Sequence, residues 1–120
     1  MIMTQKTNIQ MLGLIDLLRD NSRKQNANIW GRIAADLEKP TRQRRLVNIY
    51  KLDKYTKENE TVIVPGKVLG TGELSHKINV AAFSFSDGAK EKILKAKGQC
   101  LTITELLQKN PNGKDIRILG

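Results

Sequence analysis

The sequence has few of the residues that build disulfides, metal sites or aromatic binding surfaces. Its 120 residues include one cysteine, Cys100, one histidine, His76, and five aromatic residues. A lone cysteine excludes an internal disulfide, and the absence of paired Cys and His spacings excludes a zinc site, so we expect a reducing, intracellular environment. With so few aromatics, aliphatic side chains must form most of the core. We expect no aromatic platform for stacking single-stranded bases.

Long hydrophobic runs are also missing. The most apolar stretch, residues 9–18, is interrupted by Asp16 and is followed by no small-residue cleavage site, so it does not resemble a signal peptide. It is far shorter than the roughly 20 residues that cross a bilayer. We therefore expect no membrane partner.

What the chain has in excess is positive charge. The formal net charge is +9 and the sequence pI is about 9.9, a balance that favours phosphate polyanions over acidic small substrates. The charge is uneven, since residues 39–57 hold seven basic residues against one acid, Asp53. Nucleic acid is therefore the expected partner, and this segment is the expected contact.

Three arginines, Arg42, Arg44 and Arg45, lie within four residues of one another in this segment. Arginine forms fork-like contacts with phosphate oxygens, and no run of acids nearby neutralises the cluster. The chain shows no zinc-finger, zipper or recognition-helix pattern, which favours structured RNA over sequence-specific DNA. A small DNA-binding chromatin or transcription factor remains the alternative, and a small enzyme is a third class.

A catalytic site is not visible. Cys100 lies in an apolar stretch and is expected to be a small buried hydrophobe, while His76 lies in a predicted turn and is either solvated or facing RNA. The glycines of Gly70-Thr71-Gly72 lack the third glycine and the following helix of a dinucleotide site, and Gly66-Lys67 lacks the spacing of a P-loop. We expect no enzyme activity, cofactor, metal or small-molecule substrate.

The hydrophobic pattern predicts an α/β fold in one globular domain. A capping box at Thr7–Gln10 predicts a helix from there to about residue 22, and Pro40 ends a second helix that starts near residue 23 or 27. Helices are then expected over 86–96, capped by Ser86, and from the capping box at 102–105. Strands are expected over 47–52, 62–64, 67–69, 77–85, 99–101 and 115–119, with tight turns at Pro65-Gly66, Gly70-Thr71-Gly72 and 110–113. The predicted organisation is a helical hairpin (1–40), a basic connector with the first strand (41–57) and a mixed α/β core (58–120).

Several motifs, taken in order, resemble a known family. They are the basic run 39–45 with Val47-Asn48, the stretch Val64-Pro65-Gly66-Lys67-Val68-Leu69-Gly70, the pair Gly72 and Leu74, and Phe85-Ser86 with Ala89. In this order they resemble the archaeal form of the L-eighteen-e family of large-subunit ribosomal proteins, over nearly the whole chain. Trp30-Gly31 with Ile33-Ala34 in the second predicted helix is similar to that family as well.

The resemblance implies a structural protein of the cytoplasmic ribosome, bound to large-subunit ribosomal RNA beside neighbouring ribosomal proteins. It also implies a core of irregularly stacked strand-strand-helix units, similar to bacterial L-fifteen. Basic side chains would then neutralise phosphates where RNA helices approach one another. Asn48 would either contact RNA or cap the turn after its strand. The expected RNA contacts are Arg42, Arg44, Arg45, Lys51, Lys67 and Asn48, with Lys39, Arg32, His76 and Lys77 as further candidates.

One position departs from the family pattern. The family tends to have paired glycines after the helix that begins near Ser86, whereas this chain has Lys97-Gly98. We expect the turn there to be tighter or shifted by one residue.

Overall fold

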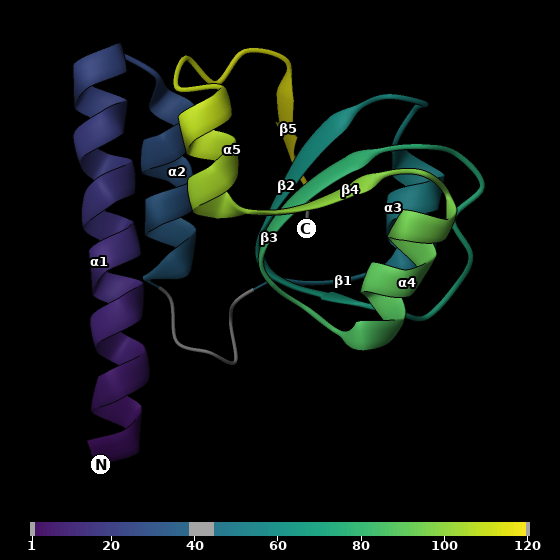
Figure 1. Cartoon of the computed structure of the whole chain (residues 1–120). Coiled ribbons are helices and arrows are strands. Elements are labelled where there is room, and N and C mark those ends of the chain that lie inside the picture. The colour runs from purple at the N-terminus through teal and green to yellow at the C-terminus, as the bar shows by residue number, and fades with distance from the viewer. Residues whose placement is uncertain (1, 39–44, 120) are drawn as a thin grey trace.

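Helices come first along the chain, and strands then alternate with further helices (Figure 1). The structure is a computed structural model, and it describes residues 2–38 and 45–119. The expected α/β class is confirmed. The helices are α1 (Ile2–Gln25), α2 (Asn28–Leu37), α3 (Ile49–Tyr55), α4 (Asp87–Lys95) and α5 (Ile103–Lys109). The strands are β1 (Arg45–Asn48), β2 (Thr61–Leu69), β3 (Asn79–Phe85), β4 (Gln99–Thr102) and β5 (Ile116–Ile118).

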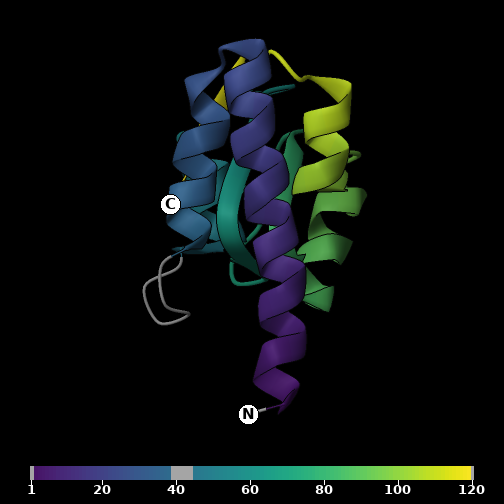
Figure 2. The same ribbon diagram turned by 90° about the vertical axis from the view of Figure 1, so that its left-hand side faces the viewer.

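The predicted hairpin of two helices is present, because α1 and α2 run antiparallel and pack side by side (Figures 1 and 2). Asn26 separates them with a left-handed backbone (φ 52°), a conformation that asparagine tolerates at helix ends. The predicted start of the first helix at Thr7 is wrong, since α1 begins at Ile2. Thr7 therefore lies inside the helix, so the capping-box pattern at residues 7–10 does not mark its N-terminus.

All the strand pairs in the described residues are parallel, in the order β1-β2-β3-β4. The strand β2 has a different neighbour along each half of one edge. Its first half pairs with β5, with Thr61 opposite Ile116, and its second half pairs with β1, with Lys67 opposite Leu46. β1, which begins at Arg45 within the basic segment, is thereby fixed beside Lys67.

Two local predictions were wrong. The strand expected over 47–52 ends at Asn48, and the chain turns directly into α3, because Ile49 and Leu52 are three residues apart and both are buried on one helical face. The turn expected at Pro65-Gly66 lies inside β2 instead, where it shifts the register between Val64 and Lys67. Proline lacks the backbone N–H that a regular ladder needs, so it is accommodated at this irregularity.

The later elements follow the prediction closely. The Ser86 side chain accepts a hydrogen bond from the Ala89 backbone N–H (3.2 Å) and caps α4. Thr102 and Glu105 form the expected capping box of α5. After α5, the turn at 110–113 is tied to the hairpin, since the indole Nε1 of Trp30 donates to the carbonyl oxygen of Pro111 at 2.9 Å.

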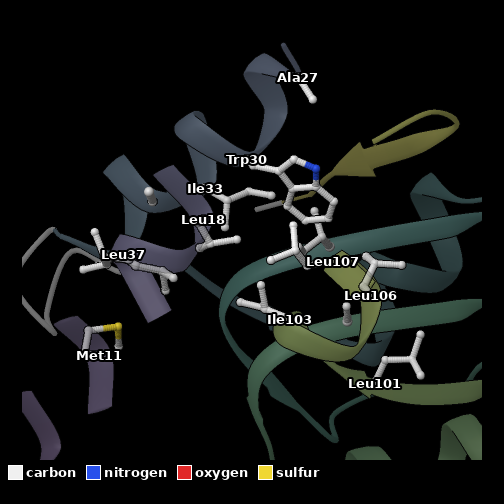
Figure 3. Close-up of a cluster of buried hydrophobic side chains, with 14 residues drawn as sticks. Met11, Leu18, Ala27, Trp30, Ile33, Leu37, Leu101, Ile103, Leu106 and Leu107 are labelled. Atoms are coloured by element: carbon white, nitrogen blue, oxygen red, sulfur yellow. The ribbon is translucent and has the colours of Figure 1, made fainter. Parts of the chain in front are cut away.

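The sheet has a layer of helices on each face. α1, α2 and α5 cover one face and α3 and α4 cover the other, as Figure 1 shows, and Figure 2 shows α2 and α5 on either side of α1. Trp30, Ile33 and Leu37 of α2 are fully buried in a first hydrophobic core, between the sheet and the layer of α1, α2 and α5 (Figure 3). Sheet residues such as Ile63 belong to the same core. A second hydrophobic core lies between the sheet and the layer of α3 and α4. It includes Val47 of β1 together with Ile49 and Leu52 of α3.

Candidate nucleic-acid interface

The arginine cluster lies mostly in the undescribed part of the chain. Arg42, Arg44 and Lys39 fall outside the described residues. The backbone of Arg45 begins β1 and is paired with Gly66 of β2. The segment therefore enters the sheet next to Lys67, which is exposed on β2 beside an exposed Leu46.

Other predicted contacts do not lie together. Lys51 is half-buried on α3, whereas Arg32 is exposed on α2, in the helical layer that covers the opposite face of the sheet (Figure 1). Lys77 is exposed in the loop before β3. A single flat contact surface does not include all of these residues.

Asn48 occupies the N-cap position of α3, but its side chain makes no capping hydrogen bond. The capping alternative for Asn48 is therefore wrong. Its side-chain oxygen Oδ1 is buried and has no hydrogen-bond partner among residues 2–38 and 45–119. Contact of Asn48 with RNA remains a prediction.

His76 takes part in a network that holds the 70–77 loop against α3. Its Nε2 lies 2.7 Å from the hydroxyl of Thr56, and its Nδ1 lies 3.5 Å from Oδ1 of Asp53. Only 18% of the His76 side chain is exposed, so the expectation of a solvated histidine is wrong. Its buried contacts give it a positioning role, and contact with RNA remains a prediction.

Asp53, the one acid of the basic segment, is engaged by the same loop. Ser75 donates to Oδ1 of Asp53 from its hydroxyl at 2.6 Å and from its backbone N–H at 2.8 Å. These two hydrogen bonds lower the pKa of the Asp53 carboxyl below its ordinary value, and the nearby His76 adds to the effect. The carboxylate thus joins α3 to the loop.

The glycines at 70 and 72 let this loop approach two helices closely. A Cβ on Gly72, whose φ is +105°, would lie 2.6 Å from the backbone nitrogen of Tyr50. The Tyr50 N–H donates to the Thr71 carbonyl oxygen at 2.9 Å, and the Lys92 ammonium of α4 donates to the Gly70 carbonyl oxygen at 2.7 Å. The glycine pair therefore serves packing, in agreement with the sequence-based rejection of a dinucleotide site.

The sequence analysis missed a cluster on the outer side of α3. Tyr50 and Tyr55 are 57% and 45% exposed, and the Lys54 ammonium lies 5.9 Å and 5.5 Å from their ring centroids. The sequence analysis expected no aromatic platform, and it did not anticipate that these two tyrosines are exposed next to each other. The buried pair Ile49 and Leu52, at helical spacing, is the sequence signal that could have revealed this face.

The arrangement offers little for catalysis. No group of three or more His, Cys, Asp or Glu side chains that could hold a metal was found in the described part of the chain. Burial raises the pKa of the Cys100 thiol, which packs at the edge of the second core, although Lys90 opposes the effect. None of the described helices is both long and apolar enough to cross a membrane. The exposed side chains on the outer side of α3 are cationic and aromatic.

Comparison with known proteins gives a match over almost the full chain. Residues 3–120 match a family described as "Ribosomal protein 60S L18 and 50S L18e". Proteins named large ribosomal subunit protein eL18 are similar in three archaea. The one from Methanoregula boonei is 49% identical over 96% of this chain and 95% of its own length. Those from Methanothermobacter thermautotrophicus and Sulfurisphaera tokodaii are each 47% identical, over 95% and 97% of this chain and 94% and 95% of their own lengths.

Proposed function

Because the chain belongs to the family of ribosomal proteins 60S L18 and 50S L18e, we propose that it is a structural constituent of the large ribosomal subunit in the cytoplasm. The observation that carries this proposal is the match over residues 3–120 together with relatives of nearly equal length. Family members are named as ribosomal proteins rather than as enzymes, so the role is structural and not catalytic.

The proposed mechanism is the neutralisation of RNA phosphates by a basic surface centred on β1. The arginines at 42, 44 and 45 lead into this strand, and Lys67 lies next to it on β2. A positively charged group held by a rigid strand loses little freedom when it binds, which favours contact with a phosphate in a fixed place. Ribosomal RNA is the proposed partner, and neighbouring large-subunit proteins are expected around it.

A DNA-binding role for the helical hairpin has less support. Trp30, Ile33 and Leu37 place the apolar side of α2 in the core, and α1 packs along the same helix. A recognition helix must present a free face to the major groove. Arg32 is exposed on the outer side of α2, but among the described residues of the hairpin no contact distinguishes duplex DNA as the partner.

Binding to nucleic acids of two kinds tests the proposal. The full chain would be titrated onto a folded large-subunit RNA fragment and onto duplex DNA of equal length, at several salt concentrations. We expect the RNA to bind at least about tenfold more tightly at physiological salt, since non-specific duplex binding weakens strongly with salt. Equal affinity for both, or tighter binding to DNA, would contradict the proposal.

A further inference from the structure

The outer side of α3 carries an aromatic and cationic cluster, formed by Tyr50, Lys54 and Tyr55, that the phosphate contacts do not explain. We propose that this α3 face binds unpaired nucleotides of the RNA, with bases stacked on the two tyrosine rings and a phosphate held by Lys54. The inference rests on the proposed function, because it assigns a second binding site on the same RNA.

The three side chains form one patch. Tyr50 and Tyr55 are 57% and 45% exposed, and Lys54 lies between them, 5.9 Å and 5.5 Å from the ring centroids. On a helix, residues four apart lie side by side, which brings Lys54 next to Tyr50, and Tyr55 follows in the chain. A base stacked on either ring would place its backbone phosphate within reach of this ammonium.

Scattered exposed aromatics are normal on protein surfaces, and one such residue would carry no conclusion. This chain has only five aromatic residues. One of them, Trp30, is fully buried in the core, whereas both tyrosines lie together on one short helix with a cation between them. Aromatic rings interleaved with positive charge are typical of surfaces that bind single-stranded nucleic acid.

The helix that carries the patch is held in place on its buried side by the core and by the loop at residues 70–77. Ile49 and Leu52 are fully buried, Asp53 accepts two hydrogen bonds from Ser75, and the Tyr50 N–H donates to Thr71. Thr56 is held by His76 at 2.7 Å. Because α3 cannot shift easily, the rings are pre-organised and little conformational entropy is lost when a base stacks on them.

The charge around α3 selects the partner. Lys51 and Lys54 lie on α3 and Lys57 follows it, and the hydrogen bonds of Asp53 are made to the loop behind the helix. Charge interaction with Tyr50 and Tyr55, together with hydrogen bonding to their side chains, raises the pKa of the Lys54 ammonium above its ordinary value. A positive surface with exposed rings fits a polyanion that has planar groups, which describes an unpaired stretch of RNA.

Salt-dependent titration separates stacking from charge neutralisation. Three full-length variants would be compared with wild type on the same large-subunit RNA fragment: Tyr50→Leu with Tyr55→Leu, Tyr50→Phe with Tyr55→Phe, and Lys54→Gln. Loss of base stacking costs about 5- to 150-fold in affinity per base, with no release of counterions. We expect the Leu variant to bind at least about tenfold more weakly at every salt concentration, with an unchanged slope of log affinity against log salt.

The Phe variant keeps the rings and is expected to retain most of the affinity that the Leu variant loses. Lys54→Gln should reduce the salt slope by about one. Phe83→Leu, which removes an exposed ring on β3, is the matched control and should bind like wild type. Circular dichroism would verify the fold of each variant, and Tyr55→Leu alone replaces the double change if packing of Tyr50 on Gly72 proves necessary for folding.

Two outcomes would overturn the inference. A folded Leu variant that binds as well as wild type would assign the α3 face to a protein neighbour or to solvent. A Phe variant that loses as much affinity as the Leu variant would show that the hydroxyl groups, and not the rings, make the contact. Failure of wild type itself to prefer the RNA would instead contradict the proposed function, so the two failures are distinguishable.

Discussion

Lys97 adopts a backbone conformation that side chains rarely take. Its φ is +67°, in the left-handed region that favours glycine. The Lys97 N–H donates to the Leu94 carbonyl oxygen at 2.9 Å, which ends α4. At the next residue, a Cβ on Gly98 would lie 2.2 Å from the carbonyl oxygen of Ile78. The turn thus needs one glycine for space and contains one lysine under strain.

These two positions predict stability changes of opposite sign. Lys97→Gly removes the strain of the left-handed backbone but makes the unfolded chain more flexible, so we expect a net gain of up to about 1 kcal/mol. Gly98→Ala forces a methyl group against a backbone oxygen and should cost more than about 2 kcal/mol. Urea unfolding of both variants checks the pair, and a loss of stability in Lys97→Gly would refute this explanation of the turn.

The arginines at 42, 44 and 45 predict a specific dependence on salt. Each phosphate contact releases a counterion, so replacing all three with Gln should lower the slope of log affinity against log salt by about two to three. Folding should change little, because a run of like charges contributes little to stability, and the melting temperature should stay within about 5 °C. Titration onto a large-subunit RNA fragment measures the slope.

The matched control removes three charges elsewhere. Lys95, Lys109 and Lys114, all exposed and distant in sequence from the cluster, would be changed to Gln. This control has the same net charge as the arginine variant and is expected to keep a slope closer to wild type. An unchanged slope in the arginine variant would place the RNA surface elsewhere, around Lys67 and Lys77.

At the scale of elements, α3 shows where sequence-based prediction failed. The run Leu46 to Leu52 is rich in residues of high β-propensity, which favours a strand, but propensity is weak evidence when burial decides. In a strand, Ile49 and Leu52 would point to opposite faces, whereas α3 places both on one buried side. The exposed tyrosines were missed for the same reason, because the expected strand ended at residue 52 and left Tyr55 outside it.

The end signals of α4 and α5 were predicted well, unlike the capping-box pattern at Thr7, which lies inside α1. The Ser86 cap of α4 and the capping box of α5 act through local hydrogen bonds, which a sequence contains in full. The role of Pro65-Gly66 depends instead on the neighbouring strands. The same dipeptide fits a turn or an irregular strand, and only the pairing of β2 with β1 and β3 decides between them.

The attachment of α3 to its loop predicts a dependence of stability on pH. The pKa of Asp53 is lowered in the folded state by the hydrogen bonds from Ser75, so its contribution to stability is present above the unfolded pKa, about 4, and is lost as pH falls through the folded pKa. Asp53→Asn should therefore cost about 1 kcal/mol at pH 7 and progressively less below pH 4.

Urea unfolding of wild type and Asp53→Asn between about pH 2.5 and 7 measures this difference. Glu91→Gln, a change in an exposed acid on α4, controls for the loss of one negative charge. A cost for Asp53→Asn that stays constant across this range would mean that the charge of the carboxylate does not hold the loop.

At the scale of the whole molecule, the basic segment contributes a helix to one of the two helical layers and none to the other. The hairpin of α1 and α2 is fixed to the sheet by a core that includes Trp30 and Ile63, while α3 follows directly from β1 on the other face. Positive charge is concentrated in the segment that contains β1 and α3, since residues 39–57 carry seven of the 21 basic residues and one of the 12 acids. The sheet therefore holds β1 and the α3 face in fixed positions relative to each other.

Sedimentation tests the central claim, membership of the large ribosomal subunit, most directly. The full chain, carrying a small tag, would be expressed in a related archaeal host, and lysate would be separated on sucrose gradients at low and at moderate salt. We predict that the protein migrates with the large subunit, in one copy per particle, and remains there at moderate salt because many phosphate contacts act together. Recovery mainly in the free soluble fractions, or with the small subunit, would contradict the claim.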